Sequence, residues 1–291
     1  KMKIVKIIGG LGNQMFQYAL AVALKKNFTN EEVKLDIHCF NGYTKHQGFE
    51  IDDVFGNQFE LASYSDIAKV AYPYCNFQLW RIGNRILPNR RYMICEDIAF
   101  NIMPEVITSP NYKYYDGYWQ HEEYFHDIKD DILAAFKFQE FKDKRNKALA
   151  DRLTDINSVS IHIRRGDYIN DKLFKGTCGI EYYQNAIDEI NKRTVPKLFC
   201  IFSNDILWCK KNIEPLLNGK ETIYVDWNTG SDNFRDMQLM TICKHCIIAN
   251  SSFSWWGAWL NNNNDKIVIA PKIWYNTNEK VSPATNDWIK L

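Results

Sequence analysis

From residue 158 onward the chain repeats one pattern, in which a short apolar run is followed by a longer segment with helical periodicity. The apolar runs predict strands at 158–163, 197–202, 222–226, 246–249 and 266–270. The segments between them predict helices at 180–193, 205–213, 232–244 and 252–261. Short strands that alternate with helices of this length are typical of a parallel sheet wound on both faces. The second half of the chain is therefore expected to be one α/β domain.

The first part of the chain opens in the same way, with a strand at 3–9, a helix at 13–26 and a strand at 32–38. Residues 40–110 are less regular, and short helices are expected near 64–71 and 75–86. A strand that turns at Gly117 and two further helices complete this part. A chain of 291 residues suits two domains of roughly 100–200 residues each. We therefore expect two Rossmann-like domains, at 1–150 and 151–291.

The charge balance and the hydropathy pattern exclude several classes of protein. Lys and Arg total 36 against 35 Asp and Glu, so the net charge is only +1. Without a global basic field, a role in coating nucleic acid is disfavoured, and any bound anion must be held by a local cluster. No apolar run reaches the roughly 18–20 residues of a transmembrane helix. The N-terminal stretch lacks the cleavage site of a signal peptide, so a cytoplasmic location is expected.

The eight cysteines lie mostly in apolar contexts, which predicts reduced core residues. The CKHC sequence at 243–246 offers two alternatives to a structural role. A zinc site would need a second ligand pair of matching spacing, and the sequence has none. A redox pair would need a helix N-terminus to lower a thiol pKa, whereas this pair falls between a helix and a strand. Both cysteines are expected to be structural, and Trp255 and Trp256 are expected to pack in the core.

Ligands of open parallel sheets bind beyond the carboxyl ends of the strands. In the second domain those ends carry clusters of polar residues: His162, Arg164 and Arg165, then Ser203, Asn204 and Asp205, then Asp226 and Asn228, then Asn250, Ser251, Ser252 and Ser254. Ser, Asn and Asp are explained as helix N-caps. The arginines are not, because a cation at a helix N-terminus opposes the helix dipole. They indicate an anion site at this edge of the sheet.

Strand alternation divides the roles of the two arginines. It places His162 and Arg164 on the same face of the strand, while Arg165 diverges into the loop. Asp167 is near enough in sequence to hold one of the guanidiniums as a bidentate partner. The alternative is that the RGD sequence is an ordinary surface turn.

The first loop, GGLGNQ at 9–14, fits a dinucleotide-binding loop only in part. In the G-x-G-x-x-G frame from Gly10 and Gly12, the third glycine is replaced by Met15. This argues against NAD and predicts a loop that lets a ligand approach the backbone. The sequence also contains no P-loop motif and no Asp-x-Asp. A diphosphate leaving group would then be held by arginines and helix N-termini in place of a metal.

Four segments span residues 7–261: IIGGLGNQMFQYA, HIRRGDY, FSNDILWCK and DMQLMTICKHCIIANSSFSWWGAWLN. With the Y-x-D-G-Y-W-Q region at 114–120, they resemble the family 11 glycosyltransferases, the α-1,2-fucosyltransferases, of the bacterial type without a membrane anchor. The resemblance implies a GT-B type of α/β fold, in which two Rossmann-like domains face each other across a cleft. It also implies GDP-β-L-fucose as the donor substrate, inversion of the anomeric centre, and no cofactor or metal.

The resemblance further assigns roles in donor binding. It implies that Arg164 contacts the β-phosphate and the glycosidic oxygen, that His162 lies at the nucleoside, and that Asp236 reads guanine or ribose. It implies that phosphates bind at the helix N-terminus formed by Ser251, Ser252 and Phe253. In the first domain, the donor's sugar and phosphates are implied to lie against Gly10, Gly12 and Asn13. The predicted donor site is completed by neighbours at the same edge, namely Arg165, Asp167, Ser203 and Asn204.

The reaction expected from the resemblance is attack by the 2-hydroxyl of a terminal β-galactoside on C1 of the fucosyl group as GDP departs. Arg164 would neutralise the negative charge that grows on the β-phosphate. The resemblance transfers no general base, and Asp36 and His38, at a strand end in the first domain, are the candidates. Acceptor specificity is expected to lie in residues 40–110 of this acceptor-side domain.

Three alternatives stay open from the sequence. The fucosyl group could go to another hydroxyl or to a protein, or the chain could be a non-catalytic module that binds a sugar nucleotide or glycan. The intact pair of His162 and Arg164 favours an enzyme. The expected partners are GDP-fucose and a β-galactoside glycan, with a lipid-linked acceptor and peripheral membrane contact left open.

Overall fold

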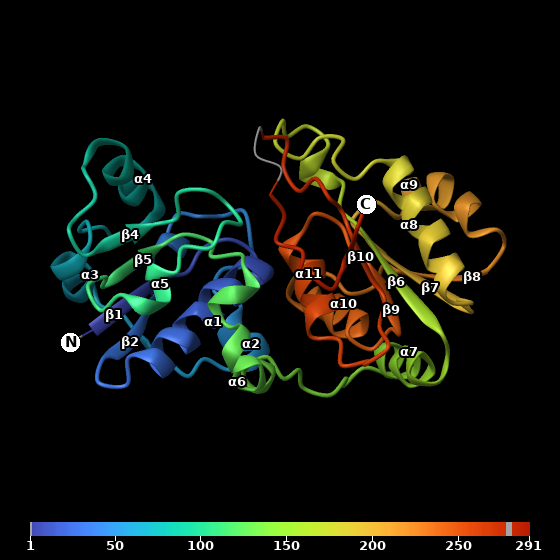
Figure 1. Ribbon diagram of the computed structural model, residues 1–291, viewed down its shortest axis with the longest axis horizontal. Helices are drawn as coiled ribbons and strands as arrows, with labels where there is room; N and C mark the ends of the chain where they lie inside the picture. The colour runs from blue at the N-terminus through green and yellow to red at the C-terminus, as the bar shows by residue number, and fades with distance from the viewer. Residues whose placement is uncertain (1, 278–280) are drawn as a thin grey trace. The chain divides into compact units, whose positions relative to one another are not determined.

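A computed structural model describes residues 2–277 and 281–291 of the chain, except for the side chain of Asp167. The chain divides into two compact units, Lys1–Gln139 and Glu140–Leu291, and each contains its own sheet (Figure 1). The division falls earlier than the predicted boundary at residue 150, because helix α7 (Lys144–Asp155) packs its Leu149 and Leu153 into a core cluster of the second unit. The α/β class with two parallel-sheet domains is confirmed, while the cleft stays a prediction.

The N-terminal unit is built on a five-stranded sheet in the order β3-β2-β1-β5-β4. Its strands are β1 (Met2–Lys6), β2 (Glu32–Asp36), β3 (Glu60–Leu61), β4 (Met93–Cys95) and β5 (Tyr114–Asp116), and all pair in parallel. Its helices are α1 (Leu11–Asn27), α2 (Ile51–Phe55), α3 (Tyr64–Val70), α4 (Phe77–Ile86), α5 (Glu105–Thr108) and α6 (Lys129–Ala135). The chain leaves β3 and returns on the other side of β1, so β1 and β5 flank the switch point of this sheet.

The C-terminal unit carries a six-stranded sheet in the order β11-β10-β9-β6-β7-β8. Its strands are β6 (Ser158–Ile163), β7 (Leu198–Ser203), β8 (Glu221–Val225), β9 (His245–Ile247), β10 (Val268–Ala270) and β11 (Ile289–Lys290), again all parallel. Besides α7, its helices are α8 (Ile180–Arg193), α9 (Ile206–Asn212), α10 (Phe234–Met240) and α11 (Ser252–Trp259). The switch point here lies between β6 and β9.

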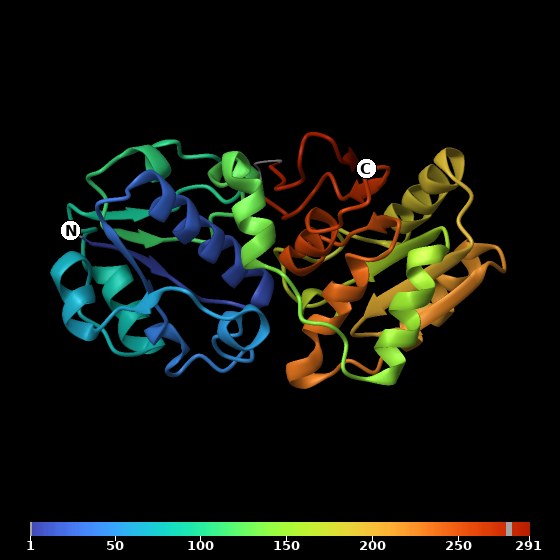
Figure 2. The same cartoon turned by 90° about the horizontal axis from the view of Figure 1, so that it is seen from below.

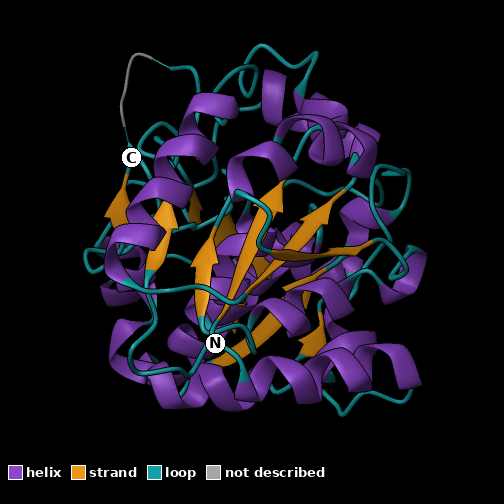
Figure 3. Ribbon diagram, turned by 90° about the vertical axis from the view of Figure 1, so that its right-hand side faces the viewer, coloured by secondary structure: helices purple, strands orange, loops and turns teal. Residues whose placement is uncertain are grey.

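Helices cover both faces of the second sheet, as the strands flanked by helices in Figure 3 show. On one face, Val159, Ile161 and Ile163 pack against α8 and α9. On the other face, β7 packs against α7 and α10. In the first unit α1 contacts β1 and β2 (Figure 2), while α3 packs on Ile4 and Tyr114 from the opposite face. Alternation along these strands therefore decides which residues reach the core.

The predicted elements of the second unit are confirmed, and β6 and α8 have the predicted bounds. Helix α10 ends at Met240 rather than near residue 244, because the chain turns there to enter β9. Strands β3, β4 and β11 were not predicted; each has only two or three residues, too few to show a pattern.

The aromatic and cysteine predictions are also confirmed. Trp255 and Trp256 are fully buried and pack edge to face. Cys243 and Cys246 are buried free thiols, and burial raises the pKa of Cys246, opposite to what a reactive pair needs. In the described parts of the chain, no helix combines the length and apolar character needed to cross a bilayer.

Candidate functional site

The carboxyl end of β6 presents His162 and Arg164 at the switch point of the second sheet. His162 points away from the α8 side: its ring centroid lies 5.8 Å from that of Phe253 on α11. Arg164 follows on the same side of the alternation, with its guanidinium 5.4 Å from the Tyr168 ring. The positive charge of Arg164 acts on the His162 ring, so the two side chains lie near each other.

His162 is held as a neutral ring. Burial, with a further contribution from the charge of Arg164, lowers its pKa to about 3. Its Nδ1 atom is buried without a hydrogen-bond partner among the described residues. An unpaired buried polar atom costs about 1–3 kcal/mol and is uncommon in native proteins. This nitrogen is therefore suited to a hydrogen bond with a bound molecule.

Arg165 has a structural environment that differs from that of Arg164. Its Nε donates to Asp205 Oδ2 at 3.2 Å, and its guanidinium lies 4.0 Å from the Trp208 ring. Its backbone N–H donates to Asn204 Oδ1 at 3.0 Å. Asp205 also caps α9 by accepting from the Trp208 N–H. Arg165 and Asn204 thus tie the loop after β6 to the loop after β7.

Gly166 is required at this junction by close packing. A Cβ atom there would collide with the side-chain amide of Asn204. The predicted ion pair of Asp167 concerns a side chain outside the described residues, and Asp205 is the partner that the structure gives to Arg165. Ser203 also serves the local backbone, because its Oγ accepts from the Asp205 N–H at 3.0 Å.

Asp236 lies in the first turn of α10, in a polar network that reaches α7. Asn228 donates to Asp236 Oδ1 at 2.8 Å, and Asn146 donates to Asn228 Oδ1 at 2.7 Å. Burial raises the pKa of Asp236 to about 7, and the hydrogen bond from Asn228 opposes part of that rise. Nearby, Asn233 Oδ1 is a second buried atom without a hydrogen-bond partner in the described chain. The start of α10 therefore holds two polar groups that a ligand could satisfy.

The N-terminus of α11 has the predicted capping chemistry. Ser251 is its N-cap, and the Oγ atom accepts from the Phe253 N–H at 3.3 Å. Ser252 and Phe253 form the first turn, beside the His162 ring. These residues therefore join the β6 end at one edge of the sheet, as predicted.

In the first unit, the GGLGNQ segment begins in the turn after β1 and continues into the first turn of α1, at the switch point of that sheet. Gly9 has a φ of 90°, a conformation that favours glycine. A Cβ on Gly10 would lie 3.1 Å from the His46 ring. Asn13 Oδ1 accepts from Gln120 Nε2 at 2.6 Å, which joins this loop to the segment after β5. Gly12 is buried within the first turn of α1.

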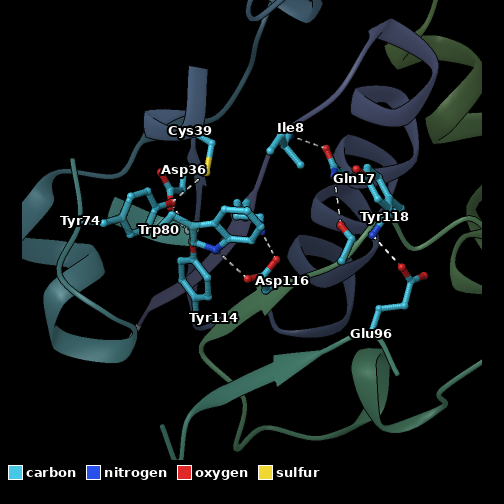
Figure 4. A network of polar contacts seen from close by, with 12 residues as sticks. Ile8, Gln17, Asp36, Cys39, Tyr74, Trp80, Glu96, Tyr114, Asp116 and Tyr118 are labelled. Carbon is cyan, nitrogen blue, oxygen red and sulfur yellow. Dashed lines mark hydrogen bonds and ion pairs between the residues drawn. The ribbon is translucent and has the colours of Figure 1, made fainter. Parts of the chain in front are cut away.

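The base candidate Asp36 lies in a network of polar contacts with Tyr74 and Tyr114 (Figure 4), and the other candidate, His38, also contacts it. Asp36 is fully buried, and its Oδ1 lies 2.9 Å from His38 Nδ1. Its Oδ2 accepts from the hydroxyls of Tyr74 and Tyr114. Both carboxylate oxygens are thus occupied by the fold, which leaves Asp36 a structural role at the end of β2.

A cavity of about 480 Å³ lies at the carboxyl ends of β1, β4 and β5, beside α4. Its lining mixes aromatic and polar side chains: Lys6, Ile8, Tyr43, Lys45, Phe77, Trp80, Asn84, Cys95, Glu96, Asp116, Gly117 and Tyr118. Clefts with an apolar wall and a few convergent polar groups are the usual form of small-molecule sites. Residues 40–110, where acceptor specificity is predicted, supply the part of this lining from Tyr43 to Glu96, and no sequence pattern singles these residues out.

A buried ion pair forms one wall of the cavity (Figure 4). Lys6 pairs with Asp116, and Trp80 Nε1 donates to the other oxygen of Asp116 at 3.0 Å. The Lys6 ammonium lies 3.5 Å from the Trp80 ring, so one face of the indole is occupied. The group fixes the indole in one orientation at the edge of the cavity.

Glu96 forms a second fixed carboxylate in the lining. Its two oxygens accept from the backbone N–H groups of Tyr118 and Trp119, each at 3.0 Å, and burial raises its pKa. Gly117 is required beside it, because a Cβ there would collide with Glu96 and with the Trp119 ring. The turn after β5 is thus shaped to present the Tyr118 side chain to the cavity.

A second hollow, of about 560 Å³, lies at the opposite ends of the strands in the C-terminal unit. It is lined by Asp188, Asn191, Lys192, Thr194, Val195, Asn218 and Lys220. Ligands of parallel sheets bind at carboxyl ends, so we attach no function to it. Within residues 2–277 and 281–291, no group of three or more His, Cys, Asp or Glu is arranged to hold a metal ion. Metal independence stays a prediction.

Comparisons with known proteins agree with these motifs. The model of glycosyl transferase family 11 matches residues 1–291. An alpha-1,2-colitosyltransferase from Escherichia coli is 35% identical, over 99% of this chain and 98% of its own. The O-antigen biosynthesis glycosyltransferase WbnK from Escherichia coli is 30% identical, over 97% of this chain and 98% of its own. Galactoside alpha-(1,2)-fucosyltransferase 2 from Gorilla gorilla gorilla is also 30% identical, over 92% of this chain and 71% of its own.

Proposed function

Because the chain belongs to glycosyltransferase family 11, we propose that it transfers L-fucose from GDP-β-L-fucose to the 2-hydroxyl of a terminal β-galactoside in a glycan. The match of the family model to the whole chain carries this proposal. The relatives named for α-1,2 transfer support the linkage, and the galactoside enzyme supports the acceptor. Transfer would invert the anomeric centre and need no metal.

The donor is assigned to the C-terminal unit. Its pyrophosphate would lie at the carboxyl end of β6, with Arg164 on the β-phosphate and the N-terminus of α11 providing further N–H donors. His162, neutral and with a free Nδ1, would bond to the nucleoside or its phosphate. Asp236 would accept hydrogen bonds from guanine or ribose. Arg165 and Asn204 would act by holding the loop in place.

Arg164 is proposed to stabilise the leaving group in the chemical step. As the bond from C1 to the phosphate oxygen breaks, negative charge grows on GDP and the sugar becomes cationic. A guanidinium that binds the departing GDP, with its extra negative charge, more tightly than it binds the intact donor lowers the barrier. The acceptor hydroxyl then attacks C1 from the opposite face, and its proton passes to water. We assign that proton to no residue, since both oxygens of Asp36 are occupied.

The acceptor is assigned to the cavity of the N-terminal unit. Trp80 and Tyr118 offer ring surfaces to the apolar face of a pyranose, and Asn84 offers an amide to its hydroxyls. Gly10, Gly12 and Asn13 lie at the same switch point as the cavity, which supports a role in lining the reacting sugars.

Release of GDP in the presence of a lactose-type acceptor, with EDTA present, tests the proposal. The expected result is turnover that EDTA leaves unchanged and a product whose anomeric proton shows the α linkage to O-2 by NMR. Turnover lost with EDTA would contradict metal independence alone. If the protein binds GDP-fucose but releases no GDP when any β-galactoside is added, a binding module or another acceptor would be favoured.

A second candidate donor is favoured by one observation, the 35% identity to an alpha-1,2-colitosyltransferase. Colitose lacks the 3-hydroxyl of fucose, so a site that hydrogen-bonds this hydroxyl would discriminate strongly between them. Competition between GDP-fucose and GDP-colitose for one acceptor gives the ratio of their kcat/KM values. A ratio that favours the colitosyl donor would replace fucose in the proposal.

A further inference from the structure

Helix α4 has two apolar faces. Phe77, Trp80 and Asn84 line the cavity, at the i, i+3, i+7 spacing of one helix face. Leu79, Ile82 and Ile86 repeat the same spacing two residues later, so they lie on the other side of the helix. Ile82 is 55% exposed and Ile86 is 72% exposed. No residue of α4 is fully buried, although apolar residues stand on both faces of the helix.

The outward face continues beyond the end of the helix. Leu87 and Tyr92 are exposed as well, and they extend the apolar surface. Arg90 donates to the carbonyl oxygens of Ala68 and Ala71, which anchors the segment after α4 to the end of α3. These exposed side chains are therefore held on a fixed backbone.

The charge of this segment has one sign. Residues 76–95 contain Arg81, Arg85, Arg90 and Arg91 and no Asp or Glu, in a chain whose net charge is only +1. Exposed apolar side chains flanked by arginines are complementary to a lipid bilayer, which is apolar inside and carries anionic headgroups at its surface. A second copy of the chain fits less well, because a two-fold contact would bring the arginines of both copies together.

We propose that this α4 surface, formed by Leu79, Ile82, Ile86, Leu87 and Tyr92 with Arg85 and Arg91, docks on an anionic lipid bilayer. The apolar side chains enter the boundary between headgroups and acyl chains, and the guanidiniums bind lipid phosphates. The opposite face of the same helix borders the cavity, so docking would place that cavity next to the bilayer surface. The proposal does not depend on which sugar is transferred.

Sedimentation of the full chain with lipid vesicles tests the proposal. Vesicles of phosphatidylcholine with about 30% phosphatidylglycerol should bind the protein, pure phosphatidylcholine should bind it weakly, and added salt should weaken binding. The double variant Ile82→Ser/Ile86→Ser and the double variant Arg85→Glu/Arg91→Glu should each reduce partitioning at least about tenfold. GDP release with a soluble lactose-type acceptor should stay near wild type in both, which also shows that they fold.

A matched control comes from helix α9, which carries a very exposed apolar residue and two lysines in its last turn. Leu207→Ser and Lys210→Glu/Lys211→Glu should leave vesicle binding unchanged. Equal losses in the α4 and α9 variants would mean that only net charge matters, and would overturn the proposal. So would a lack of binding to anionic vesicles at low salt, or self-association by sedimentation velocity that the α4 variants abolish.

Discussion

Arg164 and Arg165 are adjacent in the sequence, yet the fold gives them different tasks. Arg165 forms an ion pair with Asp205 and packs on the Trp208 ring, so its positive charge is balanced within the protein. Arg164 continues the face that carries His162, whose ring is kept neutral and has a free nitrogen. Because successive side chains of a strand point to opposite faces, Arg164 is available to a ligand while its neighbour Arg165 stabilises the loop.

Arg164→Ala should lower kcat/KM for GDP-fucose at least about a hundredfold, because it removes charge stabilisation that strengthens in the transition state. Arg164→Lys should fail as well, since an ammonium cannot fork onto two phosphate oxygens. Steady-state GDP release measures both. Arg165→Ala is the control: it should lower the melting temperature, whereas Arg164→Ala should not. More than half of wild-type activity in Arg164→Ala would refute the assignment.

Asp236 should make donor binding depend on pH. Its pKa of about 7 means that the carboxylate needed to accept hydrogen bonds is lost in the free enzyme as pH falls below 7. The KM for GDP-fucose should therefore rise about tenfold between pH 8 and pH 6, while His162, with a pKa near 3, stays neutral throughout. In Asp236→Asn the KM should be high and flat over this range. A wild-type KM that does not change with pH would contradict this role.

The same shift fixes the sign of a stability effect. The pKa of Asp236 is about 7 in the folded state and 3.8 in the unfolded state. Its contribution to the free energy of unfolding is therefore fully present below pH 3.8. As pH rises through about 7, the carboxylate must be charged in the folded state, and its contribution to the free energy of unfolding is lost. GDP-fucose, by supplying hydrogen-bond donors, should oppose that loss.

The shared face of His162 and Arg164 could be predicted from the sequence because a strand has a fixed period of two. The pairing of Arg165 with Asp205 could not, since that ion pair joins two loops 40 residues apart and depends on side-chain packing. Asp36 and His38 were base candidates because both stand at a strand end, but the two tyrosines that bond to Asp36 come from residues 74 and 114. Composition alone does not reveal such convergence.

At the scale of elements, α7 is joined to the second sheet by a compact polar cluster. Asn146 is nearly fully buried and bonds to Asp143, Trp227 and Asn228. Arg145, from the same helix, lies 3.7 Å from the Trp227 ring. These contacts explain why α7 belongs to the second unit, although the predicted boundary at residue 150 falls inside this helix.

Asn146→Ala should lower the free energy of unfolding by about 1–3 kcal/mol, because it leaves several buried polar groups without partners. Urea denaturation followed by tryptophan fluorescence measures the change. Asn212→Ala, which removes a single side-chain bond to the Trp208 carbonyl, is the control and should cost less. A decrease in the free energy of unfolding below about 0.5 kcal/mol would contradict this, because it would show that water satisfies the partners of Asn146 when its side chain is removed.

At the scale of the whole molecule, the two units repeat one rule. Each sheet reverses its strand order once, and the residues with ligand chemistry gather at that point, β6 and β9 in one sheet and β1 and β5 in the other. The alternation of strands and helices predicted the second sheet well. It predicted the first poorly, because β3 and β4 are short and the segment between β2 and β5 follows no regular period.

Hydrogen exchange should separate the two assignments. GDP-fucose should protect amides near residues 158–166 and 248–254, whereas a β-galactoside with GDP should add protection near 77–84 and 114–118. Each ligand suppresses local opening of the backbone that it contacts, so the amide hydrogens there exchange more slowly. Mass spectrometry of peptides locates the change. Protection of 77–84 by the donor alone would move the cavity from the acceptor to the donor site.

In the part of the chain that the structure describes, Cys75 is the only exposed thiol, and it comes directly before the N-cap of α4. Burial raises the pKa of Cys95 to about 11 and that of Cys178 to about 12, so both resist alkylation at neutral pH. A maleimide dye should therefore label the wild-type chain at one position without engineering. An environment-sensitive fluorophore placed there would report, by its colour, what approaches this end of the molecule.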